Sequence, residues 1–259
     1  MPTASSLRRQ IEQDLEGRFP AALTPAPRTI REVASTGIDA ADELLDGGLP
    51  VGAISEITGP ASSGRTTLAL SFVARRTTEA RQCAWVDVND ALDPESAAAN
   101  GVNLKQLLWV RCRDAVQKLS GKTRPWTRLD QALRATDLLL QAGGFAAIVI
   151  DLADTAPEHA SRIPLATWFR YRQAADRTRC SLLVLGRLAY AQSSAALAIE
   201  CAPLRSEITG GMVLRGFTYQ VRSGRQRFAP GIASGRPGIR KPPASTWSAG
   251  TAWEAGRRA

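Results

Sequence analysis

A short glycine-rich segment, GPASSGRTT at residues 59–67, has the spacing of a phosphate-binding loop. Such loops read G-x-x-x-x-G-K-[ST], and their backbone N–H groups converge on a phosphate at the N-terminus of a helix. Arg65 occupies the lysine position of this pattern. The candidate nucleotide-binding residues in the segment are Gly59, Ser63, Gly64, Arg65, Thr66 and Thr67.

An acidic residue after a distant apolar run completes the pattern. Asp151 follows AAIVI, residues 146–150, which is typical of a buried strand. Proteins with phosphate-binding loops hold Mg²⁺ through a loop hydroxyl and an acid at the end of another strand. Thr66 and Asp151 are therefore the expected Mg²⁺ ligands if ATP binds. A glycine-rich turn and a helix-capping aspartate would explain each motif separately.

The elements that must position these residues alternate along the chain. Short apolar runs indicate strands buried on both faces, and segments of helical periodicity separate several of them. The pattern predicts an α/β core with a mostly parallel sheet flanked by helices. The predicted strands are 53–59, 82–88, 107–112, 146–152 and 181–188, and the main predicted helices are 65–80, 128–144 and 164–178.

Segments outside this core predict two arms. Residues 5–19 form an expected amphipathic helix, with Leu7, Ile11, Leu15 and Phe19 as candidate partner-binding residues. With the Pro-rich stretch after it, this arm occupies residues 1–34, and the core occupies 35–229.

The segment 212–229 alternates as an exposed hairpin does, and residues 230–259 form an expected disordered basic tail. Trp247 and Trp253 in this tail are candidate partner-binding residues, and two incidental aromatic side chains are the alternative.

The charge is strongly basic, at +9, and a cluster of arginines follows Pro203. Such a distribution favours binding to polyanions, nucleic acid first, with an acidic protein partner or a solubilising tail as alternatives. The basic loop 113–128 combines lysine, arginine and tryptophan, as many single-strand-binding segments do, and a solvated surface loop is the alternative. The DNA-binding candidates are Lys118, Lys122, Arg124, Trp126, Arg225, Arg227, Arg240 and Lys241.

Other function classes are disfavoured by composition. Neither a run of 18 apolar residues nor an apolar N-terminal leader occurs, so we expect no membrane association and a cytoplasmic, nucleoid-associated protein. The four cysteines are far apart and His159 is the single histidine, which argues against a metal site other than the Mg²⁺ position.

The segments STGIDAADELLDGGLPVGAISEITGPASSGRTTLAL and CAWVDVNDALDPESAAANGVN together resemble the ATPase core of the bacterial recombinase RecA. The resemblance is close over residues 7–112 and weaker to about residue 203. Among RecA relatives, the chain is similar above all to the short proteins called ImuA. That resemblance implies an accessory role in the SOS response and error-prone translesion synthesis, as an adaptor between RecA and a mutagenic polymerase complex with an ImuB-like protein.

The chain departs from RecA at four site positions. Arg65 replaces the loop lysine, Asn89 the water-activating glutamate, Ser96 the adenine-stacking tyrosine, and Arg187 the sensor glutamine. Asp93, the adenine contact of the family, is retained. An amide cannot act as a general base at neutral pH, so the resemblance implies no catalytic residue here and at most weak ATP hydrolysis.

The implied DNA loops are also short, at residues 154–164 and 189–196. The expected partners are therefore RecA, an ImuB-like protein, an error-prone polymerase and DNA, with a small homo-oligomer as a further expectation. An active RecA-paralogue ATPase in recombinational repair is the alternative, and a SulA-like division inhibitor is a lesser one.

Overall fold

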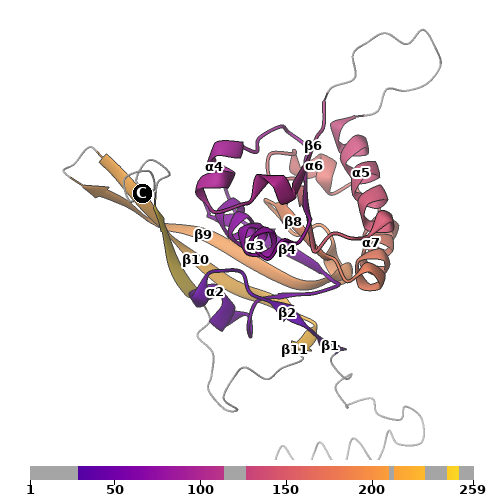
Figure 1. Cartoon of the computed structure of the whole chain (residues 1–259), viewed down its shortest axis with the longest axis horizontal. Coiled ribbons are helices and arrows are strands. Elements are labelled where there is room, and N and C mark those ends of the chain that lie inside the picture. The colour runs from indigo at the N-terminus through magenta and orange to yellow at the C-terminus, as the bar shows by residue number, and fades with distance from the viewer. Residues whose placement is uncertain (1–28, 114–126, 210–212, 231–243, 251–259) are drawn as a thin grey trace, which may run out of the picture.

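An eight-stranded sheet forms the centre of the protein, as seen in a computed structural model that describes residues 29–113, 127–209, 213–230 and 244–250. The six strands β4 to β9 run parallel to their neighbours within this set, whereas β10 pairs antiparallel with both β9 and β12 (Figure 1). In spatial order the strands are β12 (Ser245–Gly250), β10 (Val213–Gln226), β9 (Ala195–Thr209), β4 (Ile54–Thr58), β8 (Ser181–Gly186), β7 (Ala147–Asp151), β5 (Cys83–Asp87) and β6 (Leu107–Arg111). The predicted α/β fold with a mostly parallel sheet is confirmed.

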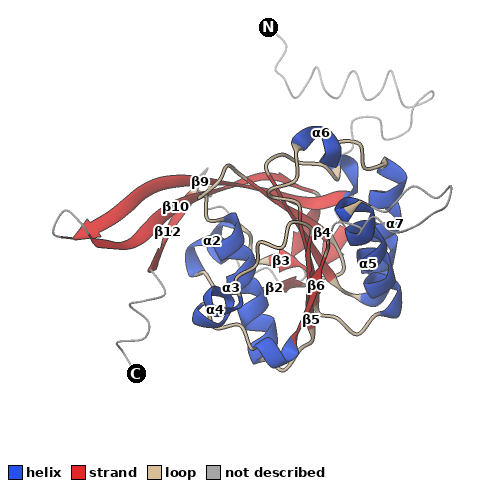
Figure 2. Ribbon diagram, turned by 90° about the horizontal axis from the view of Figure 1, so that it is seen from above, coloured by secondary structure: helices blue, strands red, loops and turns tan. Residues whose placement is uncertain are grey.

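Helices cover both faces of this sheet (Figure 2). One face carries α2 (Asp39–Leu44), α3 (Arg65–Thr78) and α4 (Pro94–Ala99), and the other carries α5 (Arg128–Ala142) and α7 (Leu165–Thr178). The remaining short elements are α6 (Pro157–Ala160), η1 (Leu104–Gln106), η2 (Gln192–Ser194), β1 (Thr29–Arg31) paired with β11 (Phe228–Pro230), and β2 (Val33–Ala34) paired with β3 (Leu49–Pro50).

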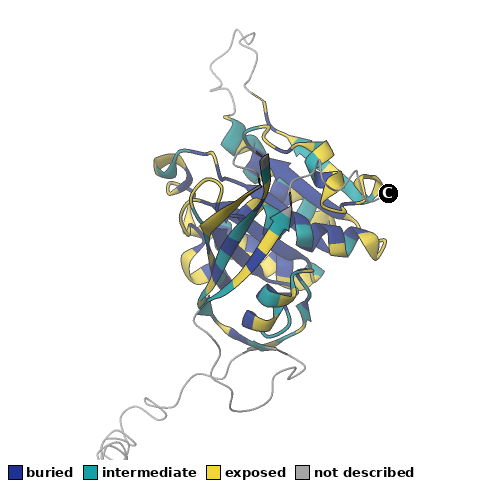
Figure 3. Ribbon diagram, turned by 90° about the vertical axis from the view of Figure 1, so that its left-hand side faces the viewer, coloured by how far each residue is buried: buried dark blue, intermediate teal, exposed yellow. Residues whose placement is uncertain are grey.

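The central strands are apolar on both faces because each face has its own core. Trp85 and Val149 pack with α3, whereas Val86 and Ile150 pack with α5 and α7. In Figure 3 these strands are dark blue, while the hairpin of β9 and β10 in front carries many intermediate and exposed residues. Full burial of such a side chain contributes roughly 1.5–3 kcal/mol. The alternation of side chains along each strand therefore divides the burial between two layers of helices.

The strand register places the carboxyl ends of β4, β8, β7 and β5 along one edge. Thr58 is paired with Gly186, and Asp151 is paired with both Leu185 and Asp87. The loop after β4 and the acid at the end of β7 therefore lie on the same edge of the sheet, as the two motifs require.

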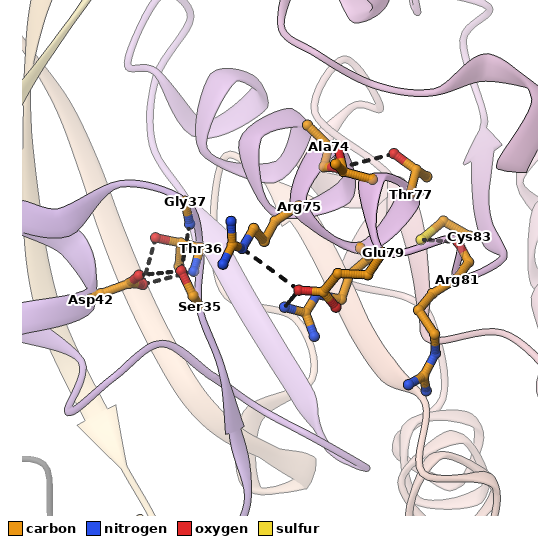
Figure 4. A network of polar contacts seen from close by, with 12 residues as sticks. Ser35, Thr36, Gly37, Asp42, Ala74, Arg75, Thr77, Glu79, Arg81 and Cys83 are labelled. Atoms are coloured by element: carbon orange, nitrogen blue, oxygen red, sulfur yellow. Dashed lines mark hydrogen bonds and ion pairs between the residues drawn. The ribbon is translucent and has the colours of Figure 1, made fainter.

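A polar network fixes the chain at the start of α2 (Figure 4). Asp42 accepts hydrogen bonds from the Ser35 hydroxyl at 2.6 Å and from the Thr36 N–H and hydroxyl at 2.7 Å each. Gly37 has φ 80, and a Cβ there would lie 2.9 Å from the Ser71 hydroxyl of α3. The segment Ser35–Gly37 is thus held both to α2, through Asp42, and close to α3, at Ser71.

Two expectations for the C-terminal part are wrong. Residues 212–229 do not form a hairpin by themselves, because β10 is one long strand whose partner is β9. The tail is not wholly disordered, because β12 at residues 245–250 pairs with β10. The expected core boundary at residue 229 therefore leaves one strand of the sheet outside. Trp247, expected to face a partner, is buried in the core of its own chain.

Several predictions lie outside the described residues. These are the arm with its linker up to residue 28, the greater part of the basic loop 113–128, and the tail segments 231–243 and 251–259. They include the candidates Leu7, Ile11, Leu15, Phe19, Lys118, Lys122, Arg124, Trp126, Arg240, Lys241 and Trp253. All four cysteines are free and buried. No helix in the described ranges is long and apolar enough to span a membrane.

Candidate nucleotide-binding site

The glycine-rich loop follows β4 and ends where α3 begins, as the sequence predicts. Its two glycines are required by close approaches of the neighbouring strands. A Cβ at Gly59 would lie 2.3 Å from the Cys201 carbonyl oxygen of β9, and one at Gly64 would lie 2.6 Å from the Tyr219 ring of β10. Gly64 also has φ 85, in the left-handed region. The loop is therefore packed against β9 and β10.

Tyr219 covers the start of α3. Its side chain is buried, its ring lies 5.2 Å from that of Trp247 between centroids, and its hydroxyl interacts with the Thr67 side chain. Burial raises the pKa of this hydroxyl. Tyr219 comes from a strand about 150 residues after the loop, and no local sequence signal connects the two. Sequence reasoning missed this residue.

Arg65 is directed back into its own loop. The side chain is buried, and its Nη1 donates to the Gly59 carbonyl and, at 2.7 Å, to the Pro60 carbonyl. Its Nε is buried and has no hydrogen-bond partner among the described residues. The positive charge of the loop is retained, but the guanidinium donates to backbone groups at the loop's beginning. A phosphate would have to displace these contacts or bind outside them.

Asp151 lies at the end of β7 with only a small exposed fraction. It accepts a hydrogen bond from the Ala153 N–H at 3.0 Å. Burial raises its pKa to about 6, and the nearby carboxylate of Asp87 adds to this, while Arg65 opposes it. Thr66 is exposed at the first turn of α3. No group of three or more metal-ligating side chains occurs among the described residues.

The position expected for the general base holds an amide that is already engaged. The Asn89 Nδ2 donates to the Thr155 hydroxyl at 3.3 Å. The neighbouring Asp90 has φ 59 and forms an ion pair with Arg111, whose Nη2 donates at 2.6 Å. That ion pair holds the pKa of Asp90 below its usual range. Asp90 therefore does not replace the missing base.

The expected adenine contacts are engaged in local structure. Asp93 is the N-cap of α4 and accepts hydrogen bonds from the N–H groups of Glu95 and Ser96 and from the Ser96 hydroxyl. Arg187, at the sensor position, is exposed, and its Nε donates to the Ala153 carbonyl at 3.3 Å. The loop, Asp151 and Asn89 thus follow one edge of the sheet.

Two of the DNA-binding candidates lie in β10 and just after it. Arg225 is half-buried and donates to the Gln192 carbonyl, so it is engaged within the chain. Arg227 is exposed, and its Nη1 donates to the Ser193 carbonyl at 3.0 Å. Of the two, Arg227 presents its charge to solvent.

Comparison with known proteins gives a consistent result. A family model described as the RecA N-terminal domain matches residues 24–160. Protein RecA of Pseudomonas fluorescens strain SBW25 and Protein RecA of Pseudomonas tolaasii are each 43% identical over 117 residues, which is 45% of this chain and 29% of theirs. Protein RecA of Pseudomonas syringae pv. syringae strain B728a is 43% identical over the same length, 28% of its chain. The match thus covers less than a third of these relatives.

Proposed function

The chain belongs to the RecA family through its RecA N-terminal domain, and on that premise we propose that it is an accessory protein of the DNA damage response. In this proposal it acts in SOS mutagenesis and error-prone translesion synthesis, as ImuA-like proteins do. It connects RecA to a complex of an ImuB-like protein and an error-prone polymerase, close to DNA.

The contacts of Arg65 and the amide at position 89 support an adaptor over an enzyme. Arg65 donates to the loop's own carbonyls, and Asn89 stands where a general base is needed. Loss of a general base alone reduces a rate by about 10² to 10⁴. A RecA-like core that lacks these groups keeps its fold and can still bind partners through its surface, but it hydrolyses ATP slowly or not at all.

A paralogue that hydrolyses ATP is the second candidate. Thr66 at the start of α3 and Asp151 at the end of β7 occupy the positions that would hold the Mg²⁺ of a bound ATP. Measurement of phosphate release with single-stranded DNA separates the two functions. DNA-stimulated release by the unmodified protein, at the rate of RecA assayed beside it, would favour the paralogue.

The adaptor role is tested at the N-terminal arm. Leu15→Glu places a charge in the predicted apolar stripe, whereas Gln13→Glu makes the same charge change off the stripe. Burial of an unpaired carboxylate is costly, so we expect Leu15→Glu to abolish capture by immobilised RecA and Gln13→Glu to preserve it. Equal capture of both variants, with circular dichroism unchanged, would remove the arm from the proposal.

A further inference from the structure

A polar cavity of about 190 Å³ lies at the opposite end of the strands from the glycine-rich loop. Ala53, which directly precedes β4, and Ala195, the first residue of β9, are in its wall. The loop follows the other end of β4. The cavity is therefore separate from the candidate nucleotide site.

Three arginines from distant parts of the sequence line this cavity. Arg31 ends β1, Arg172 lies in α7, and Arg227 directly precedes β11. The parallel pairing of β1 with β11 brings the first and the last together, and Figure 1 shows these two strands side by side. Ser193 and Ser194 of η2 also line the cavity, and the Ser193 carbonyl accepts a hydrogen bond from the Arg227 Nη1 at 3.0 Å.

The positive charge of the cavity is only partly balanced. Arg31 is largely buried, and its Nη1 donates to the Gly52 carbonyl and to Asp176, each at 2.8 Å. Neither Arg172 nor Arg227 forms an ion pair with a carboxylate of the described residues. Of the three guanidinium groups, only that of Arg31 therefore has a carboxylate partner among the described residues.

Three arginines that line one cavity favour an anion as their common partner. Like charges repel one another, and a bound anion relieves this repulsion. Guanidinium groups bind phosphate oxygens through paired N–H donors, and serine hydroxyls donate to the same oxygens. The cavity is also much larger than the roughly 10–15 Å³ that a single water requires.

We propose that this cavity binds a phosphoryl group, and that the phosphodiester backbone of nucleic acid supplies it. The net charge of +9 favours a polyanion over a small anion, because it attracts the whole strand to the protein. Binding of a nucleic-acid strand at this cavity requires neither the adaptor role nor a nucleotide at the glycine-rich loop.

Two charge reversals on α7 provide the test. Arg172 and Arg177 are both exposed on this helix, but Arg172 lines the cavity and Arg177 does not. The affinity for a fluorescein-labelled single-stranded thymidine oligonucleotide is measured by anisotropy over a range of salt. We expect Arg172→Glu to weaken binding by about tenfold or more and to reduce the slope of log affinity against log salt concentration by about one. Arg177→Glu should change the affinity by no more than about threefold. Arg172→Lys, which keeps the charge without the paired donors, should fall between.

Inorganic phosphate distinguishes the sources of the anion. At constant ionic strength, phosphate should raise the melting temperature of the unmodified protein and of Arg177→Glu, but not that of Arg172→Glu. A phosphate effect that depends on Arg172, with oligonucleotide affinity independent of it, would reject nucleic acid as the source. If polyglutamate bound as tightly as the oligonucleotide and with the same dependence on Arg172, nucleic acid would also be rejected as the source. Equal oligonucleotide losses in the two reversals, with no phosphate effect, would overturn the site itself. RecA capture by Arg172→Glu reports separately on the adaptor proposal.

Discussion

The two ends of the parallel strands hold their arginines in different ways. At the carboxyl end, Arg65 is buried and donates to carbonyls of its own loop. At the amino end, Arg172 and Arg227 line a cavity and have no carboxylate partner in the described part of the chain. The arginine at the end with the phosphate-binding motif is thus buried and held by its own loop, whereas Arg172 and Arg227 at the other end are exposed beside a cavity.

The strongest test of this contrast is ATP turnover. We expect the unmodified protein and Arg65→Lys to hydrolyse ATP at least about 10²-fold more slowly than RecA assayed beside them, because Asn89 still lacks a basic group. Phosphate release with and without single-stranded DNA provides the measurement. Recovery of the RecA rate by Arg65→Lys alone would show that the arginine, and not the missing base, is the limiting change.

A second test concerns the buried acid beside the loop. The pKa of Asp151 is raised from 3.8 to about 6, so the folded protein binds this proton more readily than the unfolded chain. Ionisation of Asp151 therefore destabilises the fold above about pH 6, and this loss disappears as the pH falls towards 4. We expect Asp151→Asn to be more stable than the unmodified protein by up to about 3 kcal/mol at neutral pH, with the difference closing near pH 4. Urea unfolding across pH measures it, and a difference independent of pH would contradict the raised pKa.

The smallest effect, on the free energy of unfolding, is expected at Tyr219, which packs against the glycine-rich loop. Tyr219→Phe removes the hydroxyl that interacts with Thr67 and should cost up to about 1 kcal/mol in the free energy of unfolding. Thr67→Ala should cost a similar amount, and the double variant should lose little more than either single variant. Full additivity of the two losses would mean that the pair does not interact.

The strands that could be predicted are those buried on both faces. The runs 82–88 and 146–152 contain the observed β5 and β7 with only one extra residue at each end, because their apolar composition follows from local burial. The helix predicted at 128–144 begins at Arg128 with a capping box between Thr127 and Asp130. Local signals of this kind can be recognised without tertiary contacts.

The strands that were missed are stabilised by pairing between distant segments. β9 contains Pro203 and alternating charged residues, and β12 lies in a sequence rich in small residues. The candidate sites also combine local and long-range features. Arg65 and Asn89 can be recognised from local sequence motifs. Tyr219 over the loop and the three arginines of the cavity were not recognised in this way, because each is brought into place by strand pairing or helix packing.

The return of the chain as β12 changes what a C-terminal truncation would mean. Residues 245–250 pair with Gly216–Val221 of β10, and Trp247 packs against Tyr219. A stop codon after Pro230 would therefore remove a strand of the sheet together with the basic segment. It would leave the backbone groups of β10 unpaired along that edge, and an unprotected edge of this kind recruits strands from other copies. Loss of DNA binding in such a truncated protein would report aggregation as readily as a missing contact, so charge substitutions within the intact chain are the sounder test.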